Sequence, residues 1–336
     1  MSRVRGPHRL RRLRRLERWA TAAVTTAALT LTASGCVVVH GEREVLPATT
    51  PAKAAKALTR FTDAYNEADK AYDRTLDADF VTGALGAIDG ARLKAGRTNN
   101  PGGNSAHTPL TLTDAKFTIP KKAGWPRWFL ADAKGNKGGN QRWLLVFLRY
   151  GATEEWRVAY LTLAAPGDVP EFRKDTDGLA EALPESSTEL AVAPGDLSKD
   201  YATYLAGGGD AFADGTHTTG WRKLRTRAAS RPGLARQYID QPMADGAYAP
   251  LALRTADGGA LVFFATRHYE KQTAAEGASV PTPNKDVQAL TTGEVRQSLT
   301  MEFISNEVAL DPPRGAAGQR VSILARVQGL TSARGE

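Results

Sequence analysis

Apolar and polar positions along residues 52–164 predict helices followed by strands. Ala52–Asp73 is expected to be a helix, because its apolar residues recur at steps of three and four and form one stripe. The stripe consists of Leu58, Phe61, Tyr65, Ala68 and Tyr72. A second helix is expected over Asp79–Lys94, although Gly83, Gly86 and Gly90 interrupt its pattern.

Four strand candidates complete this first part of the chain. They are Leu110–Ile119, Trp128–Ala133, Arg142–Tyr150 and Glu155–Ala164. The third contains the continuous apolar run W-L-L-V-F-L, which is typical of an inner strand covered on both faces. Gly151–Thr153 is short enough for a hairpin between the third and fourth strands, and Trp143 and Trp156 are expected to form a cross-strand pair there.

The same order of elements recurs in the second part of the chain. Pro166–Asp196 holds four prolines and predicts a linker with one short helix over Thr176–Leu183. Helices are expected over Leu197–Leu205 and Thr219–Ala235. Four strands are expected after them, near Pro250–Thr255, Ala260–Tyr269, Val287–Val308 and Arg320–Leu330.

The triplet L-V-F occupies equivalent places in the two parts, at Leu145–Phe147 and at Leu261–Phe263. We therefore predict an α+β fold of two tandem units, residues 52–165 and 197–332, joined by the linker 166–196 and related by an ancient duplication. Each unit has helices followed by a curved four-stranded antiparallel sheet, an order that resembles the cystatin-like or nuclear-transport-factor-2-like fold. The resemblance implies a sheet wrapped around its leading helix, and it implies no reaction.

The N-terminus has the order of a secretory signal. Eight arginines and one glutamate occupy residues 1–18, and the uncharged run Trp19–Gly35 follows. The stretch L-T-L-T-A-S-G-C ends in Cys36, the one cysteine of the sequence, and resembles a bacterial lipobox. The resemblance implies that signal peptidase II recognises Ala33, Ser34 and Gly35 and removes residues 1–35. It also implies a diacylglycerol on the thiol of Cys36 and a tether over residues 36–51.

Two features of this segment leave alternatives open. A transmembrane helix over Trp19–Gly35 is the alternative to cleavage, but the run is short for a hydrocarbon core of about 30 Å. The pair Arg11–Arg12 resembles a twin-arginine signal, so the export route stays open.

A lipidated Cys36 predicts a protein on the extracytoplasmic face of the cell membrane and leaves no thiol for a disulfide. The sequence is also rich in Ala, Gly, Arg and Pro. Together with the lipobox-like stretch, this composition resembles that of uncharacterised lipoproteins of high-GC Gram-positive bacteria.

The net charge of +8 belongs almost entirely to the signal segment. Residues 1–35 carry eight Arg and one Glu, which is +7, so +1 remains for residues 36–336 and no nucleic-acid partner is expected. One basic island is left, without an acidic residue between Asp214 and Asp240. Its candidate contact residues for anionic phospholipid or a wall polymer are Arg222, Lys223, Arg225, Arg227 and Arg231. A solvated helix face is the alternative.

Searches for catalytic and metal-binding patterns predict neither a metal site nor a cofactor. The five histidines are scattered without H-E-x-x-H, and the sequence lacks G-x-S-x-G, S-x-x-K and a glycine-rich phosphate loop. An acid and a tyrosine inside a cone would suit an enzyme of the nuclear-transport-factor-2-like fold. The residues considered for that role are Asp77, Asp79, Tyr65, Tyr72 and Tyr150, for which helix caps and core packing are the favoured interpretation.

We therefore expect a membrane-anchored extracytoplasmic binding module of the cell envelope that is not an enzyme. Its expected partners are the membrane, through the lipid, and an envelope protein or wall polymer. The alternative is a small-molecule enzyme or carrier with a cone-shaped pocket. A deep cavity faced by a buried Asp or His would favour the enzyme, and an interior packed solid by Phe, Trp and Leu would favour the binding module.

Overall fold

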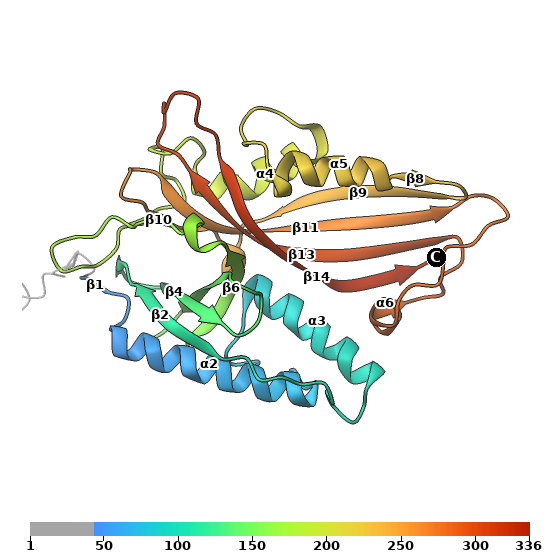
Figure 1. Ribbon diagram of the computed structural model, residues 1–336, viewed down its shortest axis with the longest axis horizontal. Coiled ribbons are helices and arrows are strands. Elements are labelled where there is room, and N and C mark those ends of the chain that lie inside the picture. The colour runs from blue at the N-terminus through green and yellow to red at the C-terminus, as the bar shows by residue number, and fades with distance from the viewer. Residues whose placement is uncertain (1–43) are drawn as a thin grey trace, which may run out of the picture. The chain divides into compact units, whose positions relative to one another are not determined.

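The computed structural model describes residues 44–336 and shows a mixed α+β architecture built on two largely antiparallel sheets (Figure 1). Residues 45–336 form one compact unit. The predicted signal segment 1–35, the cleavage site and Cys36 lie outside the described residues. The helices of the described part are α2 (Pro51–Ala71), α3 (Gly83–Asn99), α4 (Leu197–Gly207), α5 (Trp221–Ala228) and α6 (Lys285–Leu290).

Helix α2 confirms the first predicted helix. Thr50 caps it, because the Thr50 hydroxyl accepts a hydrogen bond of 3.3 Å from the backbone N–H of Lys53. The helix ends at Tyr72, which adopts a left-handed conformation with φ 50°. Helix α3 confirms the second predicted helix with later bounds, since Gly83 at φ +52° opens it.

The small sheet contains the four strands predicted for the first part of the chain. Its order is β2 (Leu112–Thr118), β4 (Arg127–Gly135), β5 (Arg142–Arg149) and β6 (Arg157–Ala164). The apolar strand β5 lies inside the sheet, as predicted, and a short hairpin joins it to β6. Beside this sheet, β1 (Val45–Pro47) pairs with β3 (Lys121–Ala123).

The two faces of the small sheet pack on different partners. One face packs on α2 through Phe129 and Phe147, whose stacked rings lie 4.7 Å apart. The other face packs on the large sheet, where the rings of Tyr160 and Phe263 lie 6.4 Å apart. The predicted pair of Trp143 with Trp156 is wrong, because Trp143 lies opposite Leu163 while Trp156 precedes β6 and packs on Phe129.

The large sheet has eight strands where four were predicted. Its main order is β12-β14-β13-β11-β10-β7, and β9 pairs with both β11 and β8. The four predicted strands correspond to β10 (Leu251–Arg254), β11 (Ala260–Ala274), β13 (Ser298–Asp311) and β14 (Ser322–Gly335). The additional strands are β7 (Ala182–Leu183), β8 (Ser230–Arg231), β9 (Leu234–Met243) and β12 (Thr291–Thr292).

Three predicted elements are corrected. The helix over Thr219–Ala235 stops at Ala228, because Pro232 and Gly233 at φ +77° turn the chain into β9. The segment predicted as a helix over Thr176–Leu183 contains turns and strand β7, since the Asp175 carboxylate accepts the N–H groups of Asp177 and Leu179. The strand predicted from Val287 begins at Ser298, after helix α6.

Helices cover the second face of the large sheet and its flank. Leu197 and Tyr201 of α4 pack on Phe264, and α5 follows over the same face (Figure 1). Helix α3 packs on β14 at Gly329, where an added Cβ would lie 2.4 Å from the Ile88 side chain, so this contact requires glycine. Among residues 44–336, no helix is both long and apolar enough to span a bilayer.

Candidate functional site

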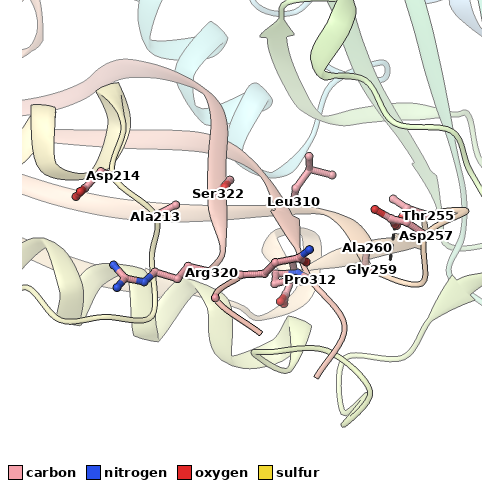
Figure 2. A pocket seen from close by; sticks show the side chains of 13 residues that line it. Ala213, Asp214, Thr255, Asp257, Gly259, Ala260, Leu310, Pro312, Arg320 and Ser322 are labelled. Carbon is pink, nitrogen blue, oxygen red and sulfur yellow. Dashed lines mark hydrogen bonds between the residues drawn. The ribbon is translucent and has the colours of Figure 1, made fainter. Parts of the chain in front are cut away.

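A pocket of about 440 Å³ opens at one end of the large sheet (Figure 2). The β10–β11 turn, the residues after β13, the start of β14 and residues 213–214 form it. Asp214 lies at one end of the pocket, and Thr255 and Asp257 lie at the other (Figure 2). The polar side chains of its lining are those of Asp214, Thr255, Asp257, Asp311, Gln319, Arg320 and Ser322.

The β10–β11 turn fixes one wall of the pocket. The Asp257 carboxylate accepts hydrogen bonds from the Thr255 hydroxyl and, at 3.3 Å, from the backbone N–H of Gly259. The hydroxyl bond lowers the pKa of Asp257, so this carboxylate is charged at neutral pH. At Gly259 an added Cβ would lie 2.7 Å from the backbone oxygen of Asp311, so only glycine allows this approach of the turn to β13.

Asp311, the last residue of β13, is the most perturbed group of the pocket. Its side chain accepts a 3.4 Å hydrogen bond from the backbone N–H of Val192 through Oδ1, and its Oδ2 has no partner among the described residues. Asp311 is only 1% exposed, and burial raises its pKa to about 7. Its charge therefore changes close to neutral pH, while Asp257 stays charged.

The lining gives the pocket a preference for a polar ligand with a positive charge. Asp214 and Asp257 place carboxylates at opposite ends, and Arg320 supplies the opposing charge. The acidic groups therefore exceed the basic ones. Sequence patterns did not predict this site, because its residues are spread from position 213 to 322 and meet only through strand pairing. The one local pattern is Asp257–Gly258–Gly259, which is typical of a turn and not of a binding site.

The structure separates the residues of the basic island. Lys223, Arg227 and Arg231 are exposed, as a surface contact requires. Arg225 is buried, and its Nη1 lies 2.6 Å from a carboxylate oxygen of Asp240 on β9. Arg225 therefore does not lie on the surface, which corrects its place in the predicted island. The fifth member, Arg222, is half-buried, with its guanidinium carbon 5.4 Å from the ring centroid of Tyr204.

A buried polar layer lies under α5, on the face of the large sheet that the helix covers. His268 stacks on Phe303 with ring centroids 4.9 Å apart, and burial lowers its pKa to about 3, so its imidazole is neutral. The Thr266 hydroxyl donates a 2.8 Å hydrogen bond to Glu307, whose pKa burial raises to about 8. Beside this layer, α5 contacts the sheet through the Arg225–Asp240 pair and through Trp221, whose ring centroid lies 6.4 Å from that of His268.

Two of the five residues considered for a catalytic cone lie in one buried cluster between α2 and α3. Asp77 is 1% exposed, and burial with the neighbouring Asp89 raises its pKa to about 8. The guanidinium carbon of Arg92 lies 5.6 Å from the ring centroid of Tyr65, and Arg92 also pairs with Asp89 at 2.8 Å. The charged groups of this cluster pair with one another, since Arg92 contacts both Asp89 and Tyr65. Such internal pairing fits core packing better than substrate binding. Across residues 44–336, no group of three or more His, Cys, Asp or Glu side chains is arranged to hold a metal ion.

Comparison with known proteins finds relatives along the whole chain. Residues 45–335 match the family described as Domain of unknown function (DUF8094). Over the full length of both chains, the sequence is 68% identical to an uncharacterized lipoprotein of Streptomyces coelicolor and 57% identical to an uncharacterized lipoprotein of Streptomyces avermitilis. Another uncharacterized lipoprotein of Streptomyces coelicolor is 28% identical over 286 residues, which cover 80% of this chain and 78% of the relative. No solved structure matches the chain.

Proposed function

The chain belongs to the family described as Domain of unknown function (DUF8094) and is related to actinobacterial lipoproteins, and from this premise we propose that it is a lipid-anchored binding module of the extracytoplasmic face. The anchor is a diacylglycerol on Cys36, added when signal peptidase II removes residues 1–35. The lipobox-like stretch ending in Ala33, Ser34, Gly35 and Cys36 supports this assignment, as do the names of the relatives. Two acyl chains hold a protein stably on a bilayer where one would not.

The packing of the two sheets supports a binding role. The space between them is filled by large apolar side chains, among them Trp128, Tyr160 and Phe263, and the face under α2 is filled in the same way. A solid interior favours ligand recognition at the rim over chemistry in an enclosed cone. The pocket of Figure 2 is such a rim site, lined by seven polar side chains, and it is the observation that carries the binding proposal.

The proposed ligand class is a hydroxyl-rich molecule or polymer that carries an ammonium group. Asp214 and Asp257 would attract the ammonium, while Thr255, Gln319 and Ser322 would bind hydroxyl groups. Polymers with such groups fit the expected envelope partner.

We also retain the duplication as part of the proposal. Helices α2 and α3 precede the small sheet, as α4 and α5 precede most of the large one, and both L-V-F triplets lie in inner strands. This origin predicts that β4–β6 superpose on β10, β11 and β13 with Leu145–Phe147 over Leu261–Phe263. A best superposition that offsets the two triplets would contradict it.

The anchor is tested by intact mass spectrometry of the chain purified from membranes. We expect a chain that starts at Cys36 with the added mass of a diacylglycerol, and we expect Cys36→Ala to lose labelling by an alkyne-tagged fatty acid. An unmodified thiol on a chain that starts at Met1 would contradict the anchor.

The pocket is tested separately with three sugars that share one ring. Glucosamine carries a positive charge, N-acetylglucosamine is neutral and glucuronate is negative. Calorimetry is expected to show the tightest binding for glucosamine, weaker binding for N-acetylglucosamine and the weakest for glucuronate. Asp257→Asn should raise the dissociation constant of glucosamine about tenfold, the factor for one charged hydrogen bond. Equal affinities for the three sugars, or no detectable binding of glucosamine, would contradict the proposed ligand class.

A further inference from the structure

A second cationic surface lies where the tether enters the described part of the chain. Val45 and Leu46 of β1 are exposed at 58% and 36%, and Trp125 of the neighbouring β3–β4 turn is exposed at 37%. The pairing of β1 with β3 brings these apolar side chains to one region. The Arg127 guanidinium also donates a hydrogen bond to the backbone oxygen of Pro47, which connects β4 to β1. We call the set Val45, Leu46, Lys53, Lys56, Trp125 and Arg149 the tether-side surface.

Cations and indole rings alternate in this surface. The guanidinium carbons of Arg127 and Arg149 lie 4.9 and 5.2 Å from the ring centroid of Trp125, and that of Arg149 also lies 4.6 Å from Trp156. The opposed positions of Arg127 and Arg149 in the β4–β5 pairing create this stack. Neither arginine has a carboxylate within salt-bridge distance among residues 44–336. The stack therefore presents positive charge that no direct ion pair among these residues neutralises, although Glu154 and Glu155 lie near Arg149.

A cavity of about 280 Å³ adjoins the stack. Lys53, Lys56, Arg60, Phe80, Arg149 and Trp156 are among its lining residues. Glu154 and Glu155 also line it, but Glu155 is held by Arg60 at 2.6 Å. Lys53 and Lys56 lie in the first turns of α2, whose N-terminal dipole adds positive potential. The cavity therefore has the charge and size to receive a phosphate group.

The length of the tether restricts where this surface can be. Val45 lies nine positions after Cys36, and nine extended residues reach at most about 32 Å. A lipid on Cys36 would keep the tether-side surface within that distance of the bilayer. Tryptophan, lysine and arginine are also the residue types that favour the interface between lipid headgroups and water.

We propose that the tether-side surface rests on an anionic phospholipid bilayer, with the Trp125 ring at the headgroup level and lipid phosphates bound by Lys53, Lys56 and Arg149. This rests on the proposed anchor at Cys36 and adds an orientation to it. The lipid alone would let the folded part rotate about its tether. The tether-side surface would fix one face of the folded part toward the membrane.

The test uses acylated protein, purified from membranes and checked by mass, in vesicles that carry bromine on their acyl chains. Bromine quenches tryptophan fluorescence at short range, and Trp125→Phe isolates the contribution of Trp125. We expect strong quenching of Trp125 when the vesicles contain phosphatidylglycerol and at least twofold less with phosphatidylcholine alone. Raising the salt to about 1 M, where the screening length is about 3 Å, should remove the difference.

Two triple variants locate the contact. Lys53→Gln, Lys56→Gln and Arg149→Gln together should remove at least half of the lipid-dependent quenching. The matched control Lys223→Gln, Arg227→Gln and Arg231→Gln removes the same charge from the basic island and should leave quenching unchanged. Acylated protein without quenching of Trp125, equal quenching in both lipids, or a loss only in the island variant would overturn the proposal. An unacylated chain would instead reject the anchor.

Discussion

The tether-side surface and the basic island use the same residue types in opposite ways. In the first, the exposed Trp125 carries Arg127 and Arg149 on its ring, and no carboxylate among the described residues pairs with them. In the basic island, the guanidinium carbon of Arg225 lies 5.0 Å from the ring centroid of Trp221, but Arg225 is buried and paired with Asp240. A run of arginines in the sequence therefore does not define a surface, because the fold decides which cations face solvent.

The difference follows from what lies beneath each set of cations. Under the tether-side surface, the small sheet is apolar, so its arginines stack on rings and hydrogen bond to backbone oxygens, without a carboxylate partner. Under α5, the large sheet offers Asp240, whose carboxylate pairs with the guanidinium of Arg225. From the other side Arg326 also reaches Trp221, with its guanidinium carbon 3.8 Å from the ring centroid. The central cation of the island therefore stabilises the fold.

The largest predicted effect is on the buried pair of the island. Asp240→Ala should lower the free energy of unfolding by about 3–5 kcal/mol, because it leaves the buried Arg225 charge without its partner. Urea denaturation measures this. The double variant Arg225→Met with Asp240→Leu should recover most of the loss, and a cost below about 1 kcal/mol for Asp240→Ala would show that the pair is not buried in solution.

The second prediction concerns the pH dependence of the polar layer under α5. Burial raises the pKa of Glu307 to about 8, so its contribution to stability is complete below its ordinary pKa and is lost as pH rises to about 8. Over that range the loss approaches about 1.4 kcal/mol per pH unit. Asp77, with a pKa raised to about 8, adds a slope of the same sign.

Glu307→Gln should therefore flatten the pH profile of the unfolding free energy between about pH 5 and 8, and Asp77→Asn should flatten the remaining slope. Denaturant titrations at fixed pH values measure both. A profile unchanged by Glu307→Gln would mean that Glu307 is ionised in the folded state, paired with Arg326.

The third prediction concerns Arg149 on the tether-side surface. Arg149→Gln should cost about 1 kcal/mol of stability, the contribution of a partly exposed cation–π contact. The same substitution should reduce the quenching of Trp125 by anionic brominated lipid. Stability and lipid contact are thus expected to respond separately, and a loss of 3 kcal/mol or more would place Arg149 in the core.

The smallest effect is predicted for the exposed cations of the island. Lys223→Gln, Arg227→Gln and Arg231→Gln should each change the unfolding free energy by less than about 0.5 kcal/mol, since none has a salt-bridge partner among residues 44–336. Urea denaturation of the three variants, side by side with Asp240→Ala, measures the contrast. A destabilisation by any one of them comparable to that of Asp240→Ala would remove the distinction within the island.

The sequence was sufficient to predict the small sheet. Its strands carry long apolar runs, such as W-L-L-V-F-L in β5, and glycine turns separate them. Strand β9, L-A-R-Q-Y-I-D-Q-P-M, was missed because its inward positions hold Asp240 and Tyr238, which read as solvent-facing in a sequence. Such residues reach the interior only because Arg225 of α5 compensates them.

The candidate sites depend on strand pairing and were therefore beyond sequence patterns. Asp311 of β13 lies opposite Ala260 of the neighbouring strand β11, and Arg149 of β5 lies opposite Arg127 of β4. No local signal in the sequence distinguishes the exposed Trp125 from the buried Trp128 and Trp143. The sequence Asp257–Gly258–Gly259 is typical of a turn, but its place in a pocket depends on the residues after β13.

Hydrogen–deuterium exchange of the acylated protein tests the orientation on the membrane most directly. Transfer from detergent to vesicles with phosphatidylglycerol should slow exchange in residues 45–56 and 121–127 and leave residues 222–231 unchanged. Slower exchange in residues 222–231, with no change at 45–56, would contradict the account.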